Sequence, residues 1–504
     1  MAIIDGFQYL FSNPEALFYV ALAAFLGTLV GALPGLTAAA AIAMLLPLTF
    51  YLDPLPALAF LYVMGKSGRF GGSIAAIIFN TPGTAAAAAT TLDGHPMAKQ
   101  GKAGKALKTA TLASVFGDTF GEMILIFGAV YIAMVTIKFG PPEYFAIHAM
   151  AFIVIGSVIG SSVVKGLISS LFGILVSLVG LDPISGMERM TFGMFELSSG
   201  FGLVPVLIGL FVFTEVFDRL TQAGGPSAVV KPITDFSGGL SKAEIKRCVP
   251  VAIRSSALGS AIGLLPGLGS SVACFVAYGE EKRRSKTPEK WGTGIVEGIA
   301  APESANNAVS GPSMVPLLTL GIPGSTIAAI LVGVFTIHGI QIGPSIFTVN
   351  RELIFGLFAA GLVGIAMYGL LGYFAAPLFA RVLQKIRPEV TYPLIFLIGF
   401  MSAYTARSNP FDIGVALAFG VIGLAMRRAG FSAPAFVISF VLAKGAEEAF
   451  RQSLLLSDQG ALIFLTRPIA LSFLLVGLAV MILRSWRGRP SRSILKDDEM
   501  GEDA

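Results

Sequence analysis

The sequence predicts an all-α protein that crosses a membrane many times. Hydrophobic residues make up 55% of the 504 residues and charged residues only 13%, and the mean hydropathy is +0.79. Apolar runs such as residues 16–35 approach the roughly 20 residues that a helix needs to span a bilayer. Two similar apolar stretches, each broken at Pro-Gly, indicate an internal repeat. We therefore expect about 10–12 membrane segments in two inverted-topology repeats with broken helices or hairpins.

Two ten-residue stretches carry the evidence for the repeat. GTLVGALPGL at 27–36 and GSAIGLLPGL at 259–268 share both glycines of a G-x-x-x-G pattern. After one residue that differs, both end in Leu-Pro-Gly-Leu. Proline removes a backbone donor and clashes one turn back, while glycine lets the chain unwind. Each stretch therefore predicts a membrane helix that is broken near its middle.

The distribution of basic residues predicts the topology, because short loops rich in Lys and Arg stay in the cytoplasm. The basic clusters are residues 99–108, 242–254, 282–290, 381–387, Arg427–Arg428 and the tail from Arg484. The second copy, within 255–278, lies between two of these clusters, so its chain enters and leaves the membrane on the same side. The first copy has acidic residues near its ends and no basic residue before Lys66. Its ends are predicted to be periplasmic, so the two copies point in opposite directions.

The remaining apolar spans fit the same topology, with their basic ends in the cytoplasm. They are 105–138 outward, 143–160 inward, 166–182 outward, 196–217 inward, 351–380 inward, 390–405 outward and 411–426 inward. Segment 431–456 is less regular, because Lys444, Glu447, Glu448 and Arg451 interrupt it. The topology requires this segment to cross the membrane, but part of it could instead lie on the membrane surface as an amphipathic helix. The predicted division is a first membrane repeat at 1–225, a cytoplasmic linker at 226–251, a second repeat at 252–485 and a cytoplasmic tail at 486–504.

A second pair of breaks supports the repeat. IIFNTPGTAAAA at 77–88 and TLGIPGSTIAAI at 319–330 each place Pro-Gly and then a hydroxyl residue inside an apolar run. Backbone groups freed inside a membrane must be satisfied by protein, by water in a cavity or by a ligand. Half-helix N-termini present free N–H groups that suit carboxylates. Four paired breaks therefore favour a binding site, although any single Pro-Gly could merely kink a packed helix.

Several blocks resemble the large membrane subunit of the tripartite tricarboxylate transporters, the TctA-like family. They are GALPGLTAAAAIAMLLPLTF at 31–50, FGGSIAAIIFNTPGT at 70–84, TLDGHPMAKQGKAGKAL at 91–107, 277–311 with EGIAAPESANNA, and 316–344. The resemblance implies a multi-pass protein of the bacterial inner membrane that takes a carboxylate from a periplasmic TctC-like binding protein. It also implies a small four-helix TctB-like membrane subunit and a sodium or proton gradient as the driving force.

A polar cluster inside the most specific block is the main candidate for substrate or ion binding. The cluster is Glu303, Ser304, Asn306, Asn307, Ser310 and Ser313. Its oxygen atoms suit Na⁺, and its amides and hydroxyls equally suit a carboxylate. The alternative is a polar helix–helix interface, but a carboxylate at membrane depth is costly without a task or a partner. Weaker candidates at the breaks are Asn80, Thr81, Gly83, Thr84, Gly267, Ser270, Ser271, Gly324, Ser325 and Thr326.

Four charged residues depart from the family pattern, which is uncharged here. Lys66 and Arg69 lie three residues apart in KSGRFGGS, and Asp118 and Glu122 lie four apart in SVFGDTFGEMIL. We expect the cations to pair with the anions, which would cancel the charge inside the membrane. In the alternative, Lys66 and Arg69 line a cavity and bind an anionic substrate, Arg69 in bidentate fashion. Either way, citrate is in doubt as the substrate.

Other functional classes find little support. The sequence has no H-E-x-x-H, G-x-S-x-G or Walker motif, so no enzyme and no cofactor beyond a coupling ion are expected. Its two cysteines give no disulfide framework or metal spacing, no cleavable signal peptide is evident, and the net charge of +5 needs no nucleic-acid partner. Asp93–Gly94 and Lys99 are predicted to form a solvated cytoplasmic turn, and the three histidines to be isolated. A passive channel and a stand-alone carrier of the same fold remain as alternatives.

Overall fold

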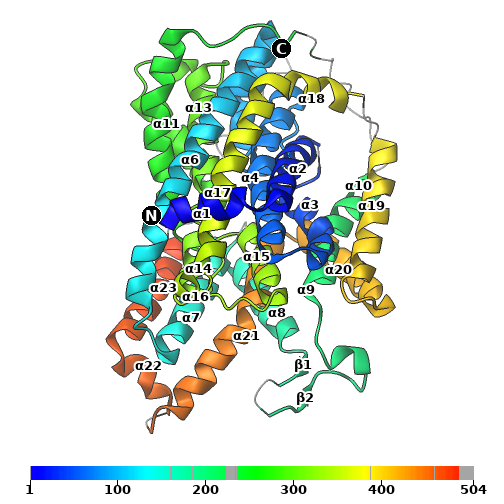
Figure 1. Cartoon of the computed structure of the whole chain (residues 1–504), viewed down its shortest axis with the longest axis vertical. Helices are drawn as coiled ribbons and strands as arrows, with labels where there is room; N and C mark the ends of the chain where they lie inside the picture. Colours follow the sequence, from blue (N-terminus) through cyan, green and yellow to red (C-terminus); the bar gives the residue numbers. More distant parts are fainter. Residues whose placement is uncertain are drawn as a thin grey trace.

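The architecture is almost entirely helical. A computed structural model describes residues 2–33, 35–158, 162–182, 185–222, 233, 235–385, 388–458 and 460–486. Within these residues, the strands β1 (Gly180–Leu181) and β2 (Glu188–Arg189) form one short antiparallel pair. Figure 1 shows long helices that run along the long axis of the molecule, with the strand pair projecting at one end. The predicted all-α class of a polytopic membrane protein is confirmed.

The helices fall on either side of the segment around residue 230. Those before it are α1 (Ala2–Phe11), α2 (Pro14–Gly31), α3 (Ala38–Leu45), α4 (Pro54–Phe79), α5 (Ala88–Met97), α6 (Ala103–Thr136), α7 (Pro141–Val158), α8 (Val163–Ser177), α9 (Leu203–Leu207) and α10 (Thr214–Gln222). Those after it, up to α17, are α11 (Lys242–Gly263), α12 (Gly269–Arg284), α13 (Val296–Ala308), α14 (Met314–Leu320), α15 (Thr326–Ile337), α16 (Ile346–Val349) and α17 (Arg351–Leu370). The last are α18 (Ala376–Leu383), α19 (Pro388–Thr405), α20 (Pro410–Arg428), α21 (Ala433–Leu455), α22 (Ile463–Thr466) and α23 (Pro468–Trp486).

Several of these helices meet the length and composition of a membrane span. Among the described residues, Pro14–Gly31, Ala88–Thr136, Arg351–Leu383 and Pro410–Arg428 are long and apolar enough to cross a bilayer. Gly460–Thr466 and Pro468–Leu483 pass the same test together, although they are bent by 83°. Other helices are shorter, or carry more charge, or are broken, as the Pro-Gly pairs predicted. The number of crossings and the inverted orientation of the repeats stay predictions.

The G-x-x-x-G glycines of the repeat are the contact points between helices. On α2, a side chain at Gly27 would overlap Ser67 of α4, and one at Gly31 would overlap the backbone of Gly68. On α11, a side chain at Gly259 would likewise overlap the backbone of Ala305 on α13. Small residues let helix backbones approach closely where a hydrophobic driving force is absent. Each copy therefore packs its glycines against a later helix of its own half, α4 in the first half and α13 in the second.

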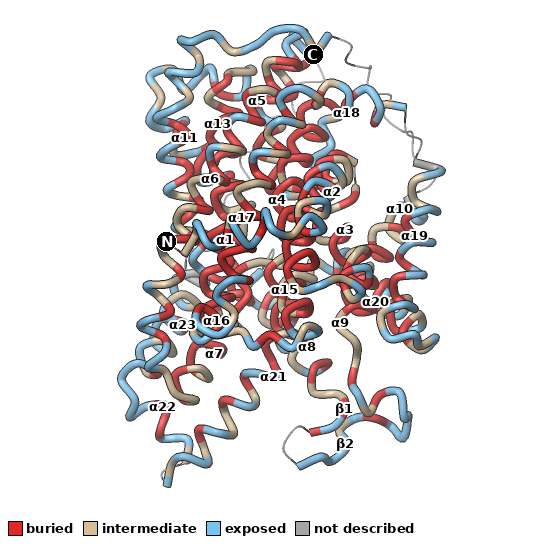
Figure 2. The backbone as a smooth tube through the Cα atoms, in the orientation of Figure 1, coloured by how far each residue is buried: buried red, intermediate tan, exposed pale blue. Residues whose placement is uncertain are grey.

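Helices from both halves of the chain are mixed in the packing. α2, α4, α6, α11, α13 and α17 contact one another, and α7, α8, α21 and α23 form a second group of contacts. A third group joins α9 and α10 to α19 and α20. Figure 2 shows that buried residues concentrate along α4, α6 and α13, whereas α22 and the strand pair mix buried and exposed residues. The most enclosed part of the molecule therefore lies where α4 and α6 of the first half meet α13 of the second half.

The segment 431–456 forms one continuous helix, α21. Two of its four charged residues have partners on the strand pair and the residues beside it. Arg451 Nη2 lies 2.7 Å from Asp182 Oδ2, and Arg189 Nη1 lies 2.7 Å from Glu447 Oε1. The charges that interrupt the apolar pattern thus bind α21 to a segment more than 250 residues earlier in the chain.

The predicted division into two repeats, a linker and a tail stays a prediction. α11 begins at Lys242, inside the predicted linker. Pro34 of the first break, most of 226–234 and residues 487–504 of the predicted tail lie outside the described residues.

Candidate functional site

The two Pro-Gly-Leu stretches are turns that require glycine. α2 ends at Gly31 and α3 begins at Ala38, and Gly35 between them has a φ of 85°. α11 ends at Gly263 and α12 begins at Gly269, and Gly267 between them has a φ of 87°. Residues with a Cβ rarely adopt this left-handed region. Both copies therefore break the helix at the same position of the motif.

Within each half, the two breaks lie against each other. In the first half, a Cβ on Gly83 would lie 3.2 Å from the carbonyl oxygen of Gly31 and 3.7 Å from that of Leu36. In the second half, the backbone nitrogen of Gly267 lies 3.5 Å from the carbonyl oxygen of Gly324. The interrupted backbone is thus gathered into two places, one for each half, as expected for a membrane protein in which such backbone must be enclosed by protein.

Thr37 and Ser325, which follow two of the breaks, cap helices, and Thr84 makes the same kind of bond in the turn before α5. Thr37 Oγ1 accepts from the amide of Ala40, Thr84 Oγ1 from that of Ala87, and Ser325 Oγ from that of Ala328, at 3.1 to 3.2 Å. Such caps satisfy amides at the start of a helix. Among the predicted site residues, Thr84 and Ser325 therefore already have partners inside the protein. Asn80 ends α4 in the left-handed region with a φ of 53°, and Asn80 and Thr81 are exposed.

The polar cluster of α13 surrounds a buried carboxylate. Glu303 is fully buried and accepts hydrogen bonds from Thr90 of α5 and, at 2.9 Å, from Ser114 of α6. No Lys, Arg or His of the described chain lies within ion-pair distance of Glu303. A carboxylate held by hydroxyl groups alone inside a membrane protein is an expected place for a proton or a hard cation.

Two amide oxygens near Glu303 on α13 have no hydrogen-bond partner among the described residues. Asn307 Nδ2 donates to the carbonyl oxygen of Glu303 at 3.0 Å, one turn back on the same helix. The Oδ1 atoms of Asn306 and Asn307 are buried and accept no hydrogen bond from the described residues. Unsatisfied buried oxygens are rare and call for an explanation. Ser304 instead donates to the carbonyl oxygen of Ala113 on α6, which is the helix-packing role.

The remaining predicted site residues lie at the margins of these features. Ser310 and Ser313 are buried in the turn between α13 and α14, where Ser313 Oγ donates to the carbonyl oxygen of Ser310 at 2.8 Å. Ser270 and Ser271 lie in the first turn of α12 and Thr326 at the start of α15, and all three are half-buried.

The four unusual charges divide unequally. Lys66 Nζ lies 2.5 Å from Asp118 Oδ1 and 2.8 Å from Glu122 Oε2, and all three side chains are fully buried. Tyr62 donates to Glu122 at 2.7 Å, and Tyr368 donates to Asp118 at 3.1 Å. Arg69 forms no hydrogen bond or ion pair with any described residue, and its Nη1 is buried without a partner. Lys66 therefore forms ion pairs with both acids, and Arg69 forms an ion pair with neither.

Asp93 and Gly94 are buried, so the predicted solvated turn is wrong for them, although Lys99 is exposed. The carboxylate of Asp93 accepts from the amides of Gly294 at 2.8 Å and Ile295 at 3.0 Å, and from the hydroxyl of Tyr278 at 2.9 Å. It also accepts from the amide of Gly292. Gly292 and Gly294 have φ values of 93° and 101°, which aims these amides at one point. The glycine spacing in KWGTG was the available signal, but its partner lies about 200 residues away.

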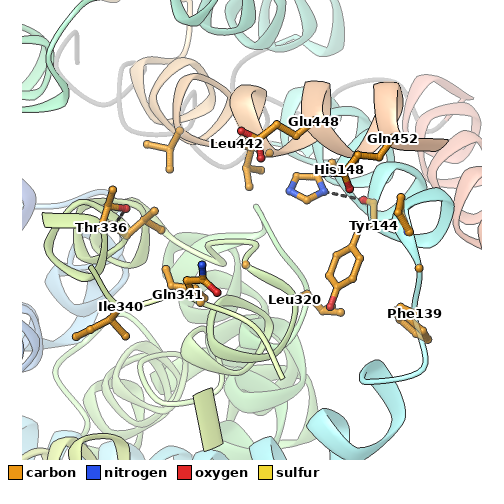
Figure 3. Close-up of a pocket in the computed structure, with 18 of the residues that line it drawn as sticks. Phe139, Tyr144, His148, Leu320, Thr336, Ile340, Gln341, Leu442, Glu448 and Gln452 are labelled. Carbon is orange, nitrogen blue, oxygen red and sulfur yellow. Dashed lines mark hydrogen bonds between the residues drawn. The ribbon is translucent and has the colours of Figure 1, made fainter. Parts of the chain in front are cut away.

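A cavity of about 780 Å³ opens beside the second break of the second half (Figure 3). Its walls come from α7, α15, α21 and the loop after α15, and Leu320 and Gly321 at the end of α14 line it. His148, Gln341 and Gln452 contribute polar side chains. His148 Nδ1 lies 2.6 Å from the carbonyl oxygen of Tyr144, so the ring is held against its own helix. The cavity therefore reaches within a few residues of Pro323–Gly324.

The described residues contain no group of His, Cys, Asp or Glu side chains that could hold a metal ion by itself. A transported Na⁺ would thus depend on hydroxyl, amide and backbone oxygens around Glu303, which are ligands suited to a hard cation.

Comparisons with known proteins converge on one family. The family described as "Tripartite tricarboxylate transporter TctA family" matches residues 17–438. An uncharacterized 52.8 kDa protein in the TAR-I ttuC' 3' region of Agrobacterium vitis is 38% identical over 476 residues, which cover 94% of each chain. An uncharacterized protein in the TAR-II ttuC' 3' region of the same organism is 36% identical over 243 residues, which are 48% of this chain and 100% of that protein. No solved structure matches the chain.

Proposed function

Because the chain belongs to the tripartite tricarboxylate transporter TctA family, we propose that it is the membrane permease of a binding-protein-dependent secondary transporter. The proposed cargo is a dicarboxylate, a tricarboxylate or a related organic anion, imported together with a cation. The membership itself makes the chain a transporter subunit. The cargo, the coupling ion and the dependence on a binding protein are parts of the proposal.

The observation that best supports the proposal is the pairing of the broken helices. The breaks of each half meet at Gly83 and Gly31 and at Gly267 and Gly324. Secondary transporters built from repeats place their substrate and ion sites at such discontinuous helices. Buried Glu303, which has hydroxyl partners and no cationic one, supplies a candidate position for the coupling ion, Na⁺ or H⁺.

The partners and the location follow from the architecture of the family. We propose a small TctB-like membrane subunit, a periplasmic TctC-like binding protein that delivers the carboxylate, and a position in the bacterial inner membrane. The cavity beside α14 is the proposed route from the periplasm toward the second break. No step of this function makes or breaks a covalent bond, so the chain acts as a carrier and not as an enzyme.

A stand-alone carboxylate carrier of the same fold is the alternative, since the breaks and Glu303 would serve it equally well. Uptake of radiolabelled citrate, succinate and benzoate separates the two when it is measured in cells with and without the binding protein. The proposal expects uptake to disappear when the binding protein is deleted. Uptake that persists would establish the stand-alone carrier. Repeating the assay with sodium replaced by choline, at two external pH values, identifies the coupling ion.

A further inference from the structure

Arg69 is a cation whose hydrogen-bonding capacity is unused inside the molecule. A guanidinium offers five N–H donors in a planar fork and stays charged under all ordinary conditions. None of these donors meets an acceptor among the described residues, and Nη1 is buried. The residue as a whole is half-buried, whereas Lys66, one turn earlier on α4, is fully buried. Arg69 thus faces space that protein atoms do not fill.

That space lies at the first half's second break. Gly72 follows Arg69 by three residues and therefore shares its face of α4. A Cβ on Gly72 would lie 3.6 Å from Ala87 Cβ and 3.9 Å from Thr84 Oγ1. The face that carries Arg69 is therefore turned toward the segment after Pro82–Gly83. Parts of this segment are exposed, among them Thr81, Pro82 and Ala85.

The second half closes the same space from the other side. Cys274 is among the titratable neighbours of Arg69, and it packs against Ala86 and Ala89. Cys274 lies on α12, five residues after the helix begins at Gly269. No side chain caps that helix, so its first amides are open to another acceptor. Arg69 and the part of α12 around Cys274 thus come together from the two halves of the chain.

Asp118, whose charge acts on Arg69, and Glu122 are both ion-paired with Lys66, and neither contacts Arg69. Asp118 and Glu122 both lie within 2.8 Å of Lys66, and Tyr368 and Tyr62 donate to them as well. The phenyl ring of Phe70 stacks on Tyr368 at a centroid distance of 5.5 Å, which keeps Tyr368 beside Asp118. An unpaired charge in a low-dielectric interior is destabilising unless an anion joins it. No described carboxylate contacts the guanidinium group of Arg69, so its N–H donors are open to an anion from outside the chain.

We propose that Arg69 binds a carboxylate group of the transported organic anion, in an internal site between α4, the Thr84–Ala89 segment and α12 around Cys274. This assignment rests on the proposed function, because it names the residue that takes the cargo. Lys66 then has a structural task only, as the counter-ion of Asp118 and Glu122. A carboxylate matches the guanidinium fork in bidentate fashion, which a lysine could not reproduce.

The test measures ligand binding to the purified full-length chain in lipid nanodiscs, through the ligand-dependent rise of its unfolding temperature. The ligands are citrate, succinate and benzoate, with phosphate and chloride at matched ionic strength as non-carboxylate anions. The variants are Arg69→Gln and Arg69→Lys. The control is Arg351→Gln, which removes an exposed arginine that pairs with Asp5. We expect at least one carboxylate to stabilise the wild type and Arg351→Gln, and to bind Arg69→Gln about ten- to a hundred-fold more weakly. Arg69→Lys should fall between them.

The unliganded proteins provide an independent readout. Because Arg69 has no partner, Arg69→Gln without ligand should unfold at the wild-type temperature or above it. A lower unfolding temperature for Arg69→Gln than for Arg351→Gln would make Arg69 structural and overturn the assignment. Equal carboxylate affinity of wild type and Arg69→Gln would overturn it too, and would leave the transport function standing. A wild type that responds to phosphate or chloride but to no carboxylate would contradict both proposals.

Discussion

Lys66 Nζ lies 2.5 Å from Asp118 Oδ1, and neither side chain is exposed to solvent. The same ammonium group also contacts Glu122 at 2.8 Å, so one cation serves two carboxylates that lie four residues apart on α6. This arrangement makes the three residues unequal. Losing Lys66 leaves two buried carboxylates side by side, whereas losing Asp118 leaves Lys66 still paired.

Lys66→Met should therefore be much more damaging than Asp118→Asn. Breaking a buried ion pair by removing one partner costs about 3–5 kcal/mol, because the remaining charge is unpaired. We expect Lys66→Met to reduce the folded yield strongly and Asp118→Asn to reduce it slightly. Lys105→Met is the matched control, since it breaks a partly exposed pair with Glu244 that contributes at most about 1 kcal/mol. Size-exclusion profiles of the detergent-solubilised variants measure the effect, and equal yields for Lys66→Met and Asp118→Asn would contradict it.

Asn307→Ala should abolish efficient uptake while membrane abundance stays near normal. The Oδ1 atom of Asn307 is buried without a protein partner, so we expect it to bind the ion or the substrate. Losing an interaction of about 1.5–3 kcal/mol with a charged group lowers affinity roughly ten- to a hundred-fold. Asn409→Ala is the control, because Asn409 only caps α20 through the amide of Phe411. Uptake affinity within twofold of wild type would place Asn307 in helix packing.

Glu303→Gln should separate transport from its driving ion. The Gln side chain keeps one oxygen that can accept from Ser114 or Thr90, and the other hydroxyl can rotate to accept from the new amide group, so the fold should survive. Lys66, Arg69, Asp118, Glu122 and Glu303 together contain two cations and three carboxylates. Neutralising Glu303 removes the excess negative charge that opposes an anionic cargo, as a bound cation would. We expect exchange of labelled for unlabelled cargo to persist and gradient-driven accumulation to stop. Accumulation that still responds to the same ion would exclude Glu303 as the ion site.

Asp93→Ala should destabilise the junction between the two halves. The substitution leaves the amides of Gly294 and Ile295 and the hydroxyl of Tyr278 without their acceptor. Each unsatisfied buried donor costs about 1–3 kcal/mol, so the total loss should exceed about 3 kcal/mol. Glu280→Ala, which removes only the exposed pairs with Arg283 and Arg284, should be almost neutral. Thermal unfolding of the two variants in one detergent decides the matter, and similar midpoints would show that Asp93 is dispensable.

Cysteine labelling tests the inverted topology. In a background without the native cysteines, a cysteine at Asp53 should react with a membrane-impermeant maleimide added to intact cells. A cysteine at Lys286 should react only after the cytoplasmic side has been exposed. The reason is that basic loops are retained in the cytoplasm, whereas the ends of the first broken segment carry only acidic charge. Labelling of both positions from the same side would rule out the inverted repeat.

The local features of the fold could be predicted from the sequence. Pro-Gly disfavours a continuous helix, and helices do end on either side of Gly35, Gly83, Gly267 and Gly324, so these breaks follow from neighbouring residues alone. The close approach of helices at Gly27 and similar positions was not predicted as such, although G-x-x-x-G was the signal that marked the repeat.

The charged residues could be only partly predicted, because their partners are far away in the chain. Lys66 and Arg69 lie three residues apart, which separates their directions on the helix by about 60°. Only the rotation of α4 against α6 decides which of them reaches Asp118, and no local pattern encodes that rotation. Asp93 was misjudged for the same reason, since its partners at 292–295 are on the other half of the chain.

Cys274 lies buried against Ala86 and Ala89, so the residues that follow the Pro82–Gly83 break cover a native thiol. Any movement that takes this segment away from α12 must uncover the sulfur atom. The rate at which a small alkylating reagent modifies Cys274, in a chain with Cys248 replaced by serine, would therefore report that movement directly. Cys274 is thus a native probe for the opening of the interior, and no new cysteine has to be introduced.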